Sequence, residues 1–497
     1  MYHLFFMVTH KAWKKNLLIK YLCPRDFSRG EMEEIMKNII LTTVSEPKKD
    51  CNGSPVFLTD ETIEERKQKI LTRMRKLHLD KLVIYGDVEH GSNFEYLVGF
   101  FTRFEEALLI IDKSGEINIV LGNENLGKAG KSRVKISKTI HVSLFSLPNQ
   151  PNRTDISFKD LLISAGLDKG QRIGLVGWKN FTSILEDNKH TYDVPYYIVK
   201  NIIDIIGDEY LLSNECSIFI GENGVRCTNN PNEIAHYEYG AALASDCILD
   251  AMNDLNLGIN ELELGDKLVR NGQHTSIVTI ASSGPRFIKA NMFPRDNTVK
   301  LGDPISLTVG YRGGLSSRCG FAVENETQLP VDQKDYLERV TIPYFNAYVA
   351  WLENIKCGLQ GHEIFDLIES ELPKEKYGWS LCPGHLTAEE EWMSSPIYEN
   401  STEVLQSGML LQIDIIPSVS GYTGSSAEST ILLADENLRN QIKKEYPGMY
   451  NRMTERRTYI INTLGINLSE DVMPMCSTVA YLRPFLLAHD KALVVKQ

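Results

Sequence analysis

Acid–base or metal chemistry in this chain of 497 residues could be carried by one histidine and two carboxylates in its second half. His385 follows Pro383 and Gly384, a pair typical of a tight, exposed backbone, and its imidazole could act as a general base, a lone metal ligand or a packed side chain bonded to backbone. Asp414 stands between isoleucines on a predicted strand, and Glu428 opens another. A buried carboxylate needs a partner. A metal-free, salt-bridged pocket in which Arg318 pairs with Asp414 is therefore the alternative to a reactive site.

The elements that would position these side chains fall into two halves with different patterns. From about residue 60 to 210, apolar strands alternate with helical segments, which indicates an α/β domain with a partly parallel sheet, placed at 60–213. The predicted helix of this half starts near Asp60, and its predicted strands are 82–86, 107–112, 117–122 and 172–177.

The second half combines long helices with short strands, a pattern typical of helices laid on an antiparallel sheet, so an α+β domain is predicted at 220–465. A C-terminal tail of 466–497 would pack back on the body. The predicted helices are 233–252, 260–271, about 332–356 and 361–373. The predicted strands are 276–281, 305–310, 409–416 and 428–433.

Composition restricts the classes of function. A net charge of -12 without a strongly basic block argues against a nucleic-acid-binding protein. No run approaches the 18 apolar residues that a membrane-spanning helix needs. Nine widely spaced cysteines without a C-x-x-C pair favour a reducing compartment, so a cytoplasmic protein is expected. Residues 1–35 are basic and aromatic without helical or strand periodicity, and we expect a non-native or disordered extension there.

Six short motifs follow one another along the chain: N-F-E-Y-L-V-G-F (93–100), N-P-N-E-I-A (230–235), A-S-S-G-P (281–285), C-P-G-H-L (382–386), S-G-M-L-L-Q-I-D (407–414) and A-E-S-T-I-L-L (427–433). In these motifs and their order the sequence resembles the creatinase, aminopeptidase P and prolidase superfamily, whose catalytic domain has the "pita-bread" fold. The resemblance implies a creatinase-like α/β N-terminal domain, an α+β pita-bread C-terminal domain and a homodimer.

The resemblance also implies a site for two divalent ions held by two Asp, one His and two Glu. Thr308 stands at the first Asp position, and either Arg318 or Cys319 stands at the second, depending on how the strand is counted. Oxygen-rich ligands are needed because adjacent cations repel each other, so a site for two ions has lost too much negative charge. The remaining ligand positions are filled by His385, Asp414 and Glu428.

Two further family positions also differ. Asn291 replaces a histidine that contacts substrate in relatives, and a second histidine position falls near Trp392, whose nearest polar neighbour is Glu391. Trp392 could instead form an apolar wall for a small substrate.

These residues predict a metal-independent or single-metal hydrolase of a small amide, guanidino or proline-type substrate, with His385 and Glu428 as catalytic residues. The alternative is an inactive pseudopeptidase that serves as a binding module. Either protein would take a small-molecule or short-peptide ligand. No cofactor is expected unless one ion of Mn, Co or Zn binds to His385, Asp414 and Glu428. The predicted substrate pocket comprises Asp414, Asn291, Arg318, Thr308 and Trp392.

Overall fold

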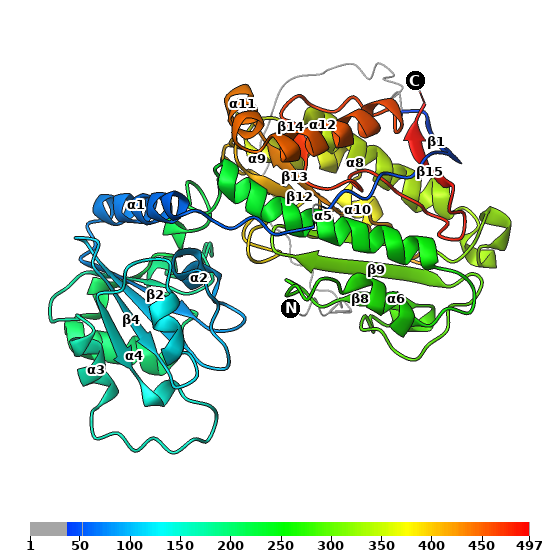
Figure 1. Cartoon of the computed structure of the whole chain (residues 1–497). Coiled ribbons are helices and arrows are strands. Elements are labelled where there is room, and N and C mark those ends of the chain that lie inside the picture. The colour runs from blue at the N-terminus through cyan, green and yellow to red at the C-terminus, as the bar shows by residue number, and fades with distance from the viewer. Residues whose placement is uncertain (1–36, 52, 497) are drawn as a thin grey trace, which may run out of the picture.

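The structure, a computed structural model, describes residues 37–51 and 53–496, so the predicted extension of residues 1–35 lies outside the described part (Figure 1). The described residues form a mixed α/β structure with four sheets. Figure 1 shows α1, α3, α4, β2 and β4 gathered in one lobe, while α5, α8, α12 and β9 lie in the other. The predicted domain limits, 60–213 and 220–465, remain a prediction.

The N-terminal lobe is built on a six-stranded sheet in the order β5-β4-β3-β2-β6-β7. The central strands are continuous apolar runs and are buried on both faces because helices cover the sheet, and β2 runs parallel to β6 but antiparallel to β3. The four strands predicted here are confirmed to within one residue at each end. The strands are β2 (Lys81–Gly86), β3 (Ala107–Asp112), β4 (Ile117–Leu121), β5 (Lys138–His141), β6 (Ile173–Val176) and β7 (Leu212–Asn214), and the helices are α1 (Asp60–Lys76), α2 (Ser92–Val98), α3 (Phe158–Ser164) and α4 (Tyr196–Ile206).

The C-terminal lobe begins with α5 (Pro231–Asp254), which packs on a three-stranded sheet of β8 (Ile280–Ser283), β9 (Pro304–Tyr311) and β10 (Gly314–Phe321). Asn230 and Glu233 form a capping box that starts the helix. Gly240 lets the helix approach the hairpin closely, since a Cβ there would lie 1.9 Å from the carbonyl oxygen of Arg312.

A second antiparallel sheet has the order β11-β12-β13-β14 and continues from the first. The junction is a bridge between Cys319 and Ser426 and a hydrogen bond from the Ser317 amide to the Glu428 carbonyl (3.2 Å). Its strands are β11 (His385–Leu386), β12 (Leu410–Gln412), β13 (Thr430–Leu433) and β14 (Val472–Pro474). The helices of this lobe after α5 are α6 (Glu261–Leu268), α7 (Pro285–Ile288), α8 (Ile342–Asn354), α9 (Gly361–Glu371), α10 (Lys374–Tyr377), α11 (Glu436–Glu445) and α12 (Pro447–Asn462).

Of the predicted tail, residues 466–496 are described, and they pack on the body as the sequence predicted. It supplies β14 and also β15 (Lys491–Val495), which pairs with β1 (Ile39–Thr43). Two predicted strands are wrong in extent: the strand predicted at 276–281 starts at Ile280, and the one predicted at 409–416 ends at Gln412. The eight cysteines that the structure describes are unpaired thiols. None of the helices in the described ranges has the length and apolar character needed to cross a bilayer.

Candidate functional site

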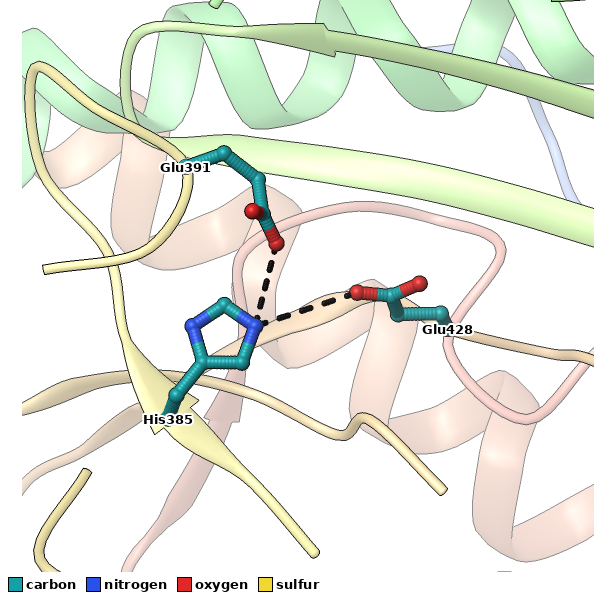
Figure 2. Close-up of side chains that lie close together, drawn as sticks. All are labelled: His385, Glu391 and Glu428. Atoms are coloured by element: carbon teal, nitrogen blue, oxygen red, sulfur yellow. Dashed lines mark ion pairs between the residues drawn. The ribbon is translucent and has the colours of Figure 1, made fainter. Parts of the chain in front are cut away.

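His385 is fully buried and faces three carboxylates, two of which Figure 2 draws. Its Nδ1 lies 3.2 Å from the Leu386 carbonyl oxygen, and because a carbonyl can only accept, Nδ1 carries the proton. Nε2 points at the carboxylates and has no hydrogen-bond partner. Its distances are 3.0 Å to Glu391 Oε1, 3.9 Å to Asp414 Oδ2 and 4.0 Å to Glu428 Oε1. This arrangement is repulsive unless a proton or a metal cation lies between these atoms.

Strand register brings the site together. Gln412 pairs with His385 on one side and with Thr430 on the other, so the ends of three strands meet at one place. Asp414 lies two residues after Gln412 and Glu428 two residues before Thr430. Gln412 donates a hydrogen bond from Nε2 to Glu428 Oε1 (3.2 Å), which orients that carboxylate. Asp414 Oδ1 is buried and has no hydrogen-bond partner.

Burial and mutual repulsion shift the protonation of the whole cluster. Burial, together with the charge of Glu391, raises the pKa of Asp414 to about 7, although His385 opposes the shift. Burial and the neighbouring carboxylates raise the pKa of Glu428 well above its usual value. Burial alone would lower the pKa of His385, but Glu391 and Asp414 raise it above its ordinary value. Without a metal cation, the cluster therefore holds protons to reduce its negative charge.

The loop after β11 supplies Glu391, one of the three carboxylates, and an aromatic wall. Trp392 stacks on His385, with ring centroids 4.1 Å apart and planes 23° apart. Two residues earlier, Glu390 and its neighbour Glu389 both accept hydrogen bonds from Arg226, which precedes α5, at 2.8 Å and 2.9 Å. Arg226 thus fixes the loop, and the next two residues, Glu391 and Trp392, reach His385.

The same arginine connects the loop to the N-terminal lobe. Arg226 also donates to Asn93 Oδ1 of α2 (2.9 Å), and Arg66 of α1 pairs with Glu233 (2.7 Å) while its Nη1 lies 3.7 Å from Glu389. The side chains of the two arginines are only 1% exposed. The acidic loop is therefore held from both lobes by buried ion pairs.

The hairpin of β9 and β10 presents hydroxyl groups where the family resemblance implied carboxylates. Thr308 pairs in register with Ser317, and their hydroxyl oxygens are 2.8 Å apart. The prediction that Arg318 or Cys319 occupies the second ligand position is wrong: Ser317 faces Thr308, because the strands are joined by a two-residue turn whose Gly313 has φ +94°. The hairpin contributes no carboxylate at this pair.

Solved structures resemble this arrangement of elements, whereas sequence comparisons find nothing. No protein-family model matches the sequence, and no curated protein matches it. Similar structures include the Xaa-Pro dipeptidase from Bacillus anthracis (TM-score 0.56, 16% identity, 76% of this chain and 96% of that chain). The dipeptidase PepE from Mycobacterium ulcerans has a TM-score of 0.58 at 15% identity and covers 76% of this chain and 94% of its own. The prolidase from Pyrococcus furiosus has a TM-score of 0.55 at 18% identity, over 73% of this chain and 96% of its own.

This chain has the pita-bread fold. The fold predicted from the ordered motifs is thereby confirmed. At 15–18% identity the likeness shows the fold alone, so the chemistry of this pita-bread protein is argued from its own residues.

Two predicted pocket residues do not join the cluster. Arg318 does not pair with Asp414, and that prediction is wrong: its guanidinium donates to the carbonyls of Tyr481 (2.9 Å) and Glu428 (2.8 Å), on the face of β10 opposite Ser317. Buried carbonyl groups satisfy the guanidinium there without a carboxylate. Asn291 is exposed after α7, and no described hydrogen bond or ion pair connects it with the cluster. The structure brings together His385, Asp414, Glu428 and Trp392, with Thr308 on the neighbouring hairpin.

Two neighbours of the cluster were not fully identified from the sequence. Glu391 was noted as the nearest polar residue to Trp392, but nothing in the run E-E-E-W tells which acid faces the histidine. Ser317 carried no signal, because its role follows from the register of the hairpin.

The donor set fits one divalent ion. Over residues 37–51 and 53–496, one group of three or more His, Cys, Asp or Glu side chains has ligand atoms that all lie within 4.8 Å of one another. The group consists of His385, Glu391 and Glu428. Asp414 adds a buried, unpaired oxygen beside them. The Nδ1 contact with a backbone carbonyl is the usual support of a metal-binding imidazole. One imidazole and three carboxylates suit Mn²⁺, Co²⁺ or Zn²⁺.

Proposed function

We propose that this protein is a hydrolase of a short peptide or small amide that works with a single divalent ion. The supporting observation is the contrast between two neighbouring groups. His385 directs an unpaired buried nitrogen at three carboxylates, whereas Thr308 and Ser317 offer neutral hydroxyls where two further carboxylates would be needed for a second ion. Negative charge is sufficient for one cation and insufficient for two.

His385, Glu391, Asp414 and Glu428 would hold the ion, which when bound would act as a Lewis acid toward a substrate carbonyl and a water molecule. The rest of the site orients the substrate. Trp392 covers one face of the imidazole and provides an apolar wall for a substrate side chain or a proline ring. A substrate that contains proline is suggested by the names of similar structures, Xaa-Pro dipeptidase and prolidase.

Proton transfer falls to the most accessible carboxylate. The side chain of Glu391 is 18% exposed, compared with 7% for Asp414 and 11% for Glu428, so an entering substrate would meet it first. The oxygen of Glu391 that does not hold the ion would accept a proton from the attacking water and return it to the leaving amine nitrogen. Arg226 acts through Glu390 and Glu389 as a positioning residue for this carboxylate.

A panel of Xaa-Pro dipeptides and small amides, assayed without metal and with Mn²⁺, Co²⁺ or Zn²⁺, tests the proposal. We expect turnover with one of the ions and its loss in His385→Ala. His362→Ala is the matched control, since His362 lies at the start of α9, partly exposed and paired with Asp366. Equal turnover by His385→Ala and the unchanged protein would refute this mechanism.

The second proposal is a binding module without catalysis, and the loss of carboxylates at Thr308 and Ser317 favours it. Binding of a dipeptide without turnover, under every metal condition, would support the module over the hydrolase. A short-peptide ligand, a homodimer, a cytoplasmic location and the absence of nucleic-acid or membrane partners are further proposals. Light scattering during size-exclusion chromatography tests the dimer.

A further inference from the structure

A second concave site lies in the N-terminal lobe and shares no residue with the cluster at His385. Its volume is about 670 Å³. The end of β2, the segment before β3, the loop after β5 and one side of α4 line it. Three of its apolar rim residues are strongly exposed: Val88, Phe104 and Leu144 at 51%, 64% and 45%. Small-molecule sites typically combine apolar and aromatic side chains with a few polar groups.

The lining carries several negative charges, and its described residues include no Lys or Arg. Two of the carboxylates already have partners. Asp87 accepts from the Tyr85 hydroxyl (3.0 Å) and lies 3.5 Å from His90 Nδ1, while Glu106 accepts from the Tyr197 hydroxyl (3.2 Å). The tyrosine rings stand beside these acids, so aromatic surface and negative charge face the same space.

Glu89 is exposed to solvent, and Glu105 is the buried lining carboxylate whose bonding is incomplete. The residue is 2% exposed, and its Oε2 accepts from the Glu124 amide at 2.8 Å. Its Oε1 is buried and has no hydrogen-bond partner. Gly122 makes room for the group, because a Cβ at that position would lie 2.4 Å from Glu105 Oε2. A buried, unpaired anionic oxygen in a cavity wall needs a donor, and a cationic ligand would supply one.

Phe104, the preceding residue, is held in an unfavourable backbone conformation. Its φ is +66°, in the left-handed region that residues with a Cβ seldom adopt, and its ring stays exposed. The ring gains no burial from this conformation, which instead places the ring at the rim of the cavity. Arg103 places its guanidinium carbon 5.0 Å from the ring centroid, which shows that the ring accepts a cation at its face.

The spacing of the acids separates a metal ion from a larger cation. In the described ranges, a group of three His, Cys, Asp or Glu side chains with ligand atoms within 4.8 Å of one another occurs at His385, Glu391 and Glu428. The acids of this cavity form no such group. A bare ion therefore finds too few ligands here. A ligand with an organic body spans the distance from Glu105 to the aromatic rim.

We propose that this cavity binds a small organic cation, an ammonium or guanidinium group on an aromatic or apolar body. The cationic group donates to Glu105 Oε1, and the body packs against Phe104 and Tyr197.

Isothermal titration of the full chain with benzylammonium and benzylguanidinium tests this assignment, with benzyl alcohol and Mg²⁺ as comparison ligands. We expect one site per chain that binds at least one of the two organic cations ~10-fold or more tightly than either comparison ligand. Glu105→Gln keeps the shape and removes the charge, and it should weaken binding by ~10-fold or more. Phe104→Ala should weaken it several-fold, and Glu186→Gln, at an exposed glutamate outside the cavity, should leave it unchanged.

His385→Ala distinguishes this site from the proposed metal site. Retained benzylammonium binding in that variant supports the cavity, and lost binding refutes it. Equal binding of benzyl alcohol or of Mg²⁺, the absence of binding by both organic cations, or full affinity in Glu105→Gln would each overturn the proposal. If Glu105→Gln does not fold, full affinity in Phe104→Ala overturns it, since that side chain is exposed and its removal leaves the core intact.

Discussion

Replacing Arg226 with methionine should destabilise the protein through the loop that carries Glu391. The arginine side chain is 1% exposed and bonds two carboxylates, of Glu389 and Glu390. Burial alone would raise the pKa of Glu389, but Arg226 and Arg66 lower it from the ordinary 4.5 to about 2. At about 1.4 kcal/mol for each tenfold change in proton affinity, this shift stabilises the folded state by about 3 kcal/mol at neutral pH. Removing one partner of a buried pair typically costs about 3–5 kcal/mol, which is consistent.

The pH dependence of the loss gives a sharper test than its size. Because the folded pKa of Glu389 is lowered, its stabilisation is present above pH 4.5 and disappears as the pH falls toward 2. Because Arg66 remains in the variant and keeps part of the shift, the difference in unfolding free energy between the unchanged protein and Arg226→Met should be at most about 3 kcal/mol from this group at pH 7, and it should shrink in acid.

Urea unfolding followed by circular dichroism measures this difference, provided that both proteins unfold cooperatively. Arg153→Met is the matched control, since Arg153 is exposed, and it should change the unfolding free energy by less than about 0.5 kcal/mol. Arg226→Lys keeps the charge but loses the two-pronged geometry, so it should fall between the two. A loss below about 1 kcal/mol for Arg226→Met, or one that is constant with pH, would refute the role of the buried pairs.

Two further predictions concern the cluster itself. In the ion-free protein, burial raises the pKa of Asp414 to about 7, so the folded state binds this proton more tightly than the unfolded state. The stability of the folded protein should fall as the pH rises from about 4 to 7.5, and Mn²⁺ should restore it at pH 7.5. Thermal unfolding measures both effects. A melting temperature that does not change with pH in the absence of metal would refute this prediction. The double variant Thr308→Asp, Ser317→Asp adds two carboxylates that face each other. Metal analysis of this variant should find a second ion per chain. An unchanged metal content would show that the missing charge at this hairpin does not limit metal binding.

The sequence predicted those elements whose residues are apolar without interruption. The strand at 82–86 appears as β2 within one residue, because its buried run leaves few alternatives. The strand β10, with the sequence G-L-S-S-R-C-G-F, was not predicted, since small and polar residues conceal a strand that is nevertheless buried along its length. Its register with β9 decides which side chain faces Thr308, and counting from a resemblance cannot supply that register.

The site was predictable only in part for a related reason. Resemblance led to His385, which lies among acidic side chains as expected for a metal ligand or a base. The role of Glu391 depends on which acids of a continuous run are taken by Arg226, a residue 163 positions away from Glu389 in the sequence. Such a long-range pairing leaves no local pattern, so the fold is needed to separate the anchoring acids from the acid at the site.

Metal analysis of the purified protein after dialysis against Mn²⁺, Co²⁺ or Zn²⁺ tests the central claim most directly. We expect one tightly bound ion per chain, lost in the His385→Ala variant, because three carboxylates and an unpaired imidazole nitrogen converge on one place. Two ions per chain would contradict it by showing that the hydroxyls of Thr308 and Ser317 suffice where carboxylates were required. Zero ions would contradict it equally, and would leave protons alone to relieve the repulsion around His385.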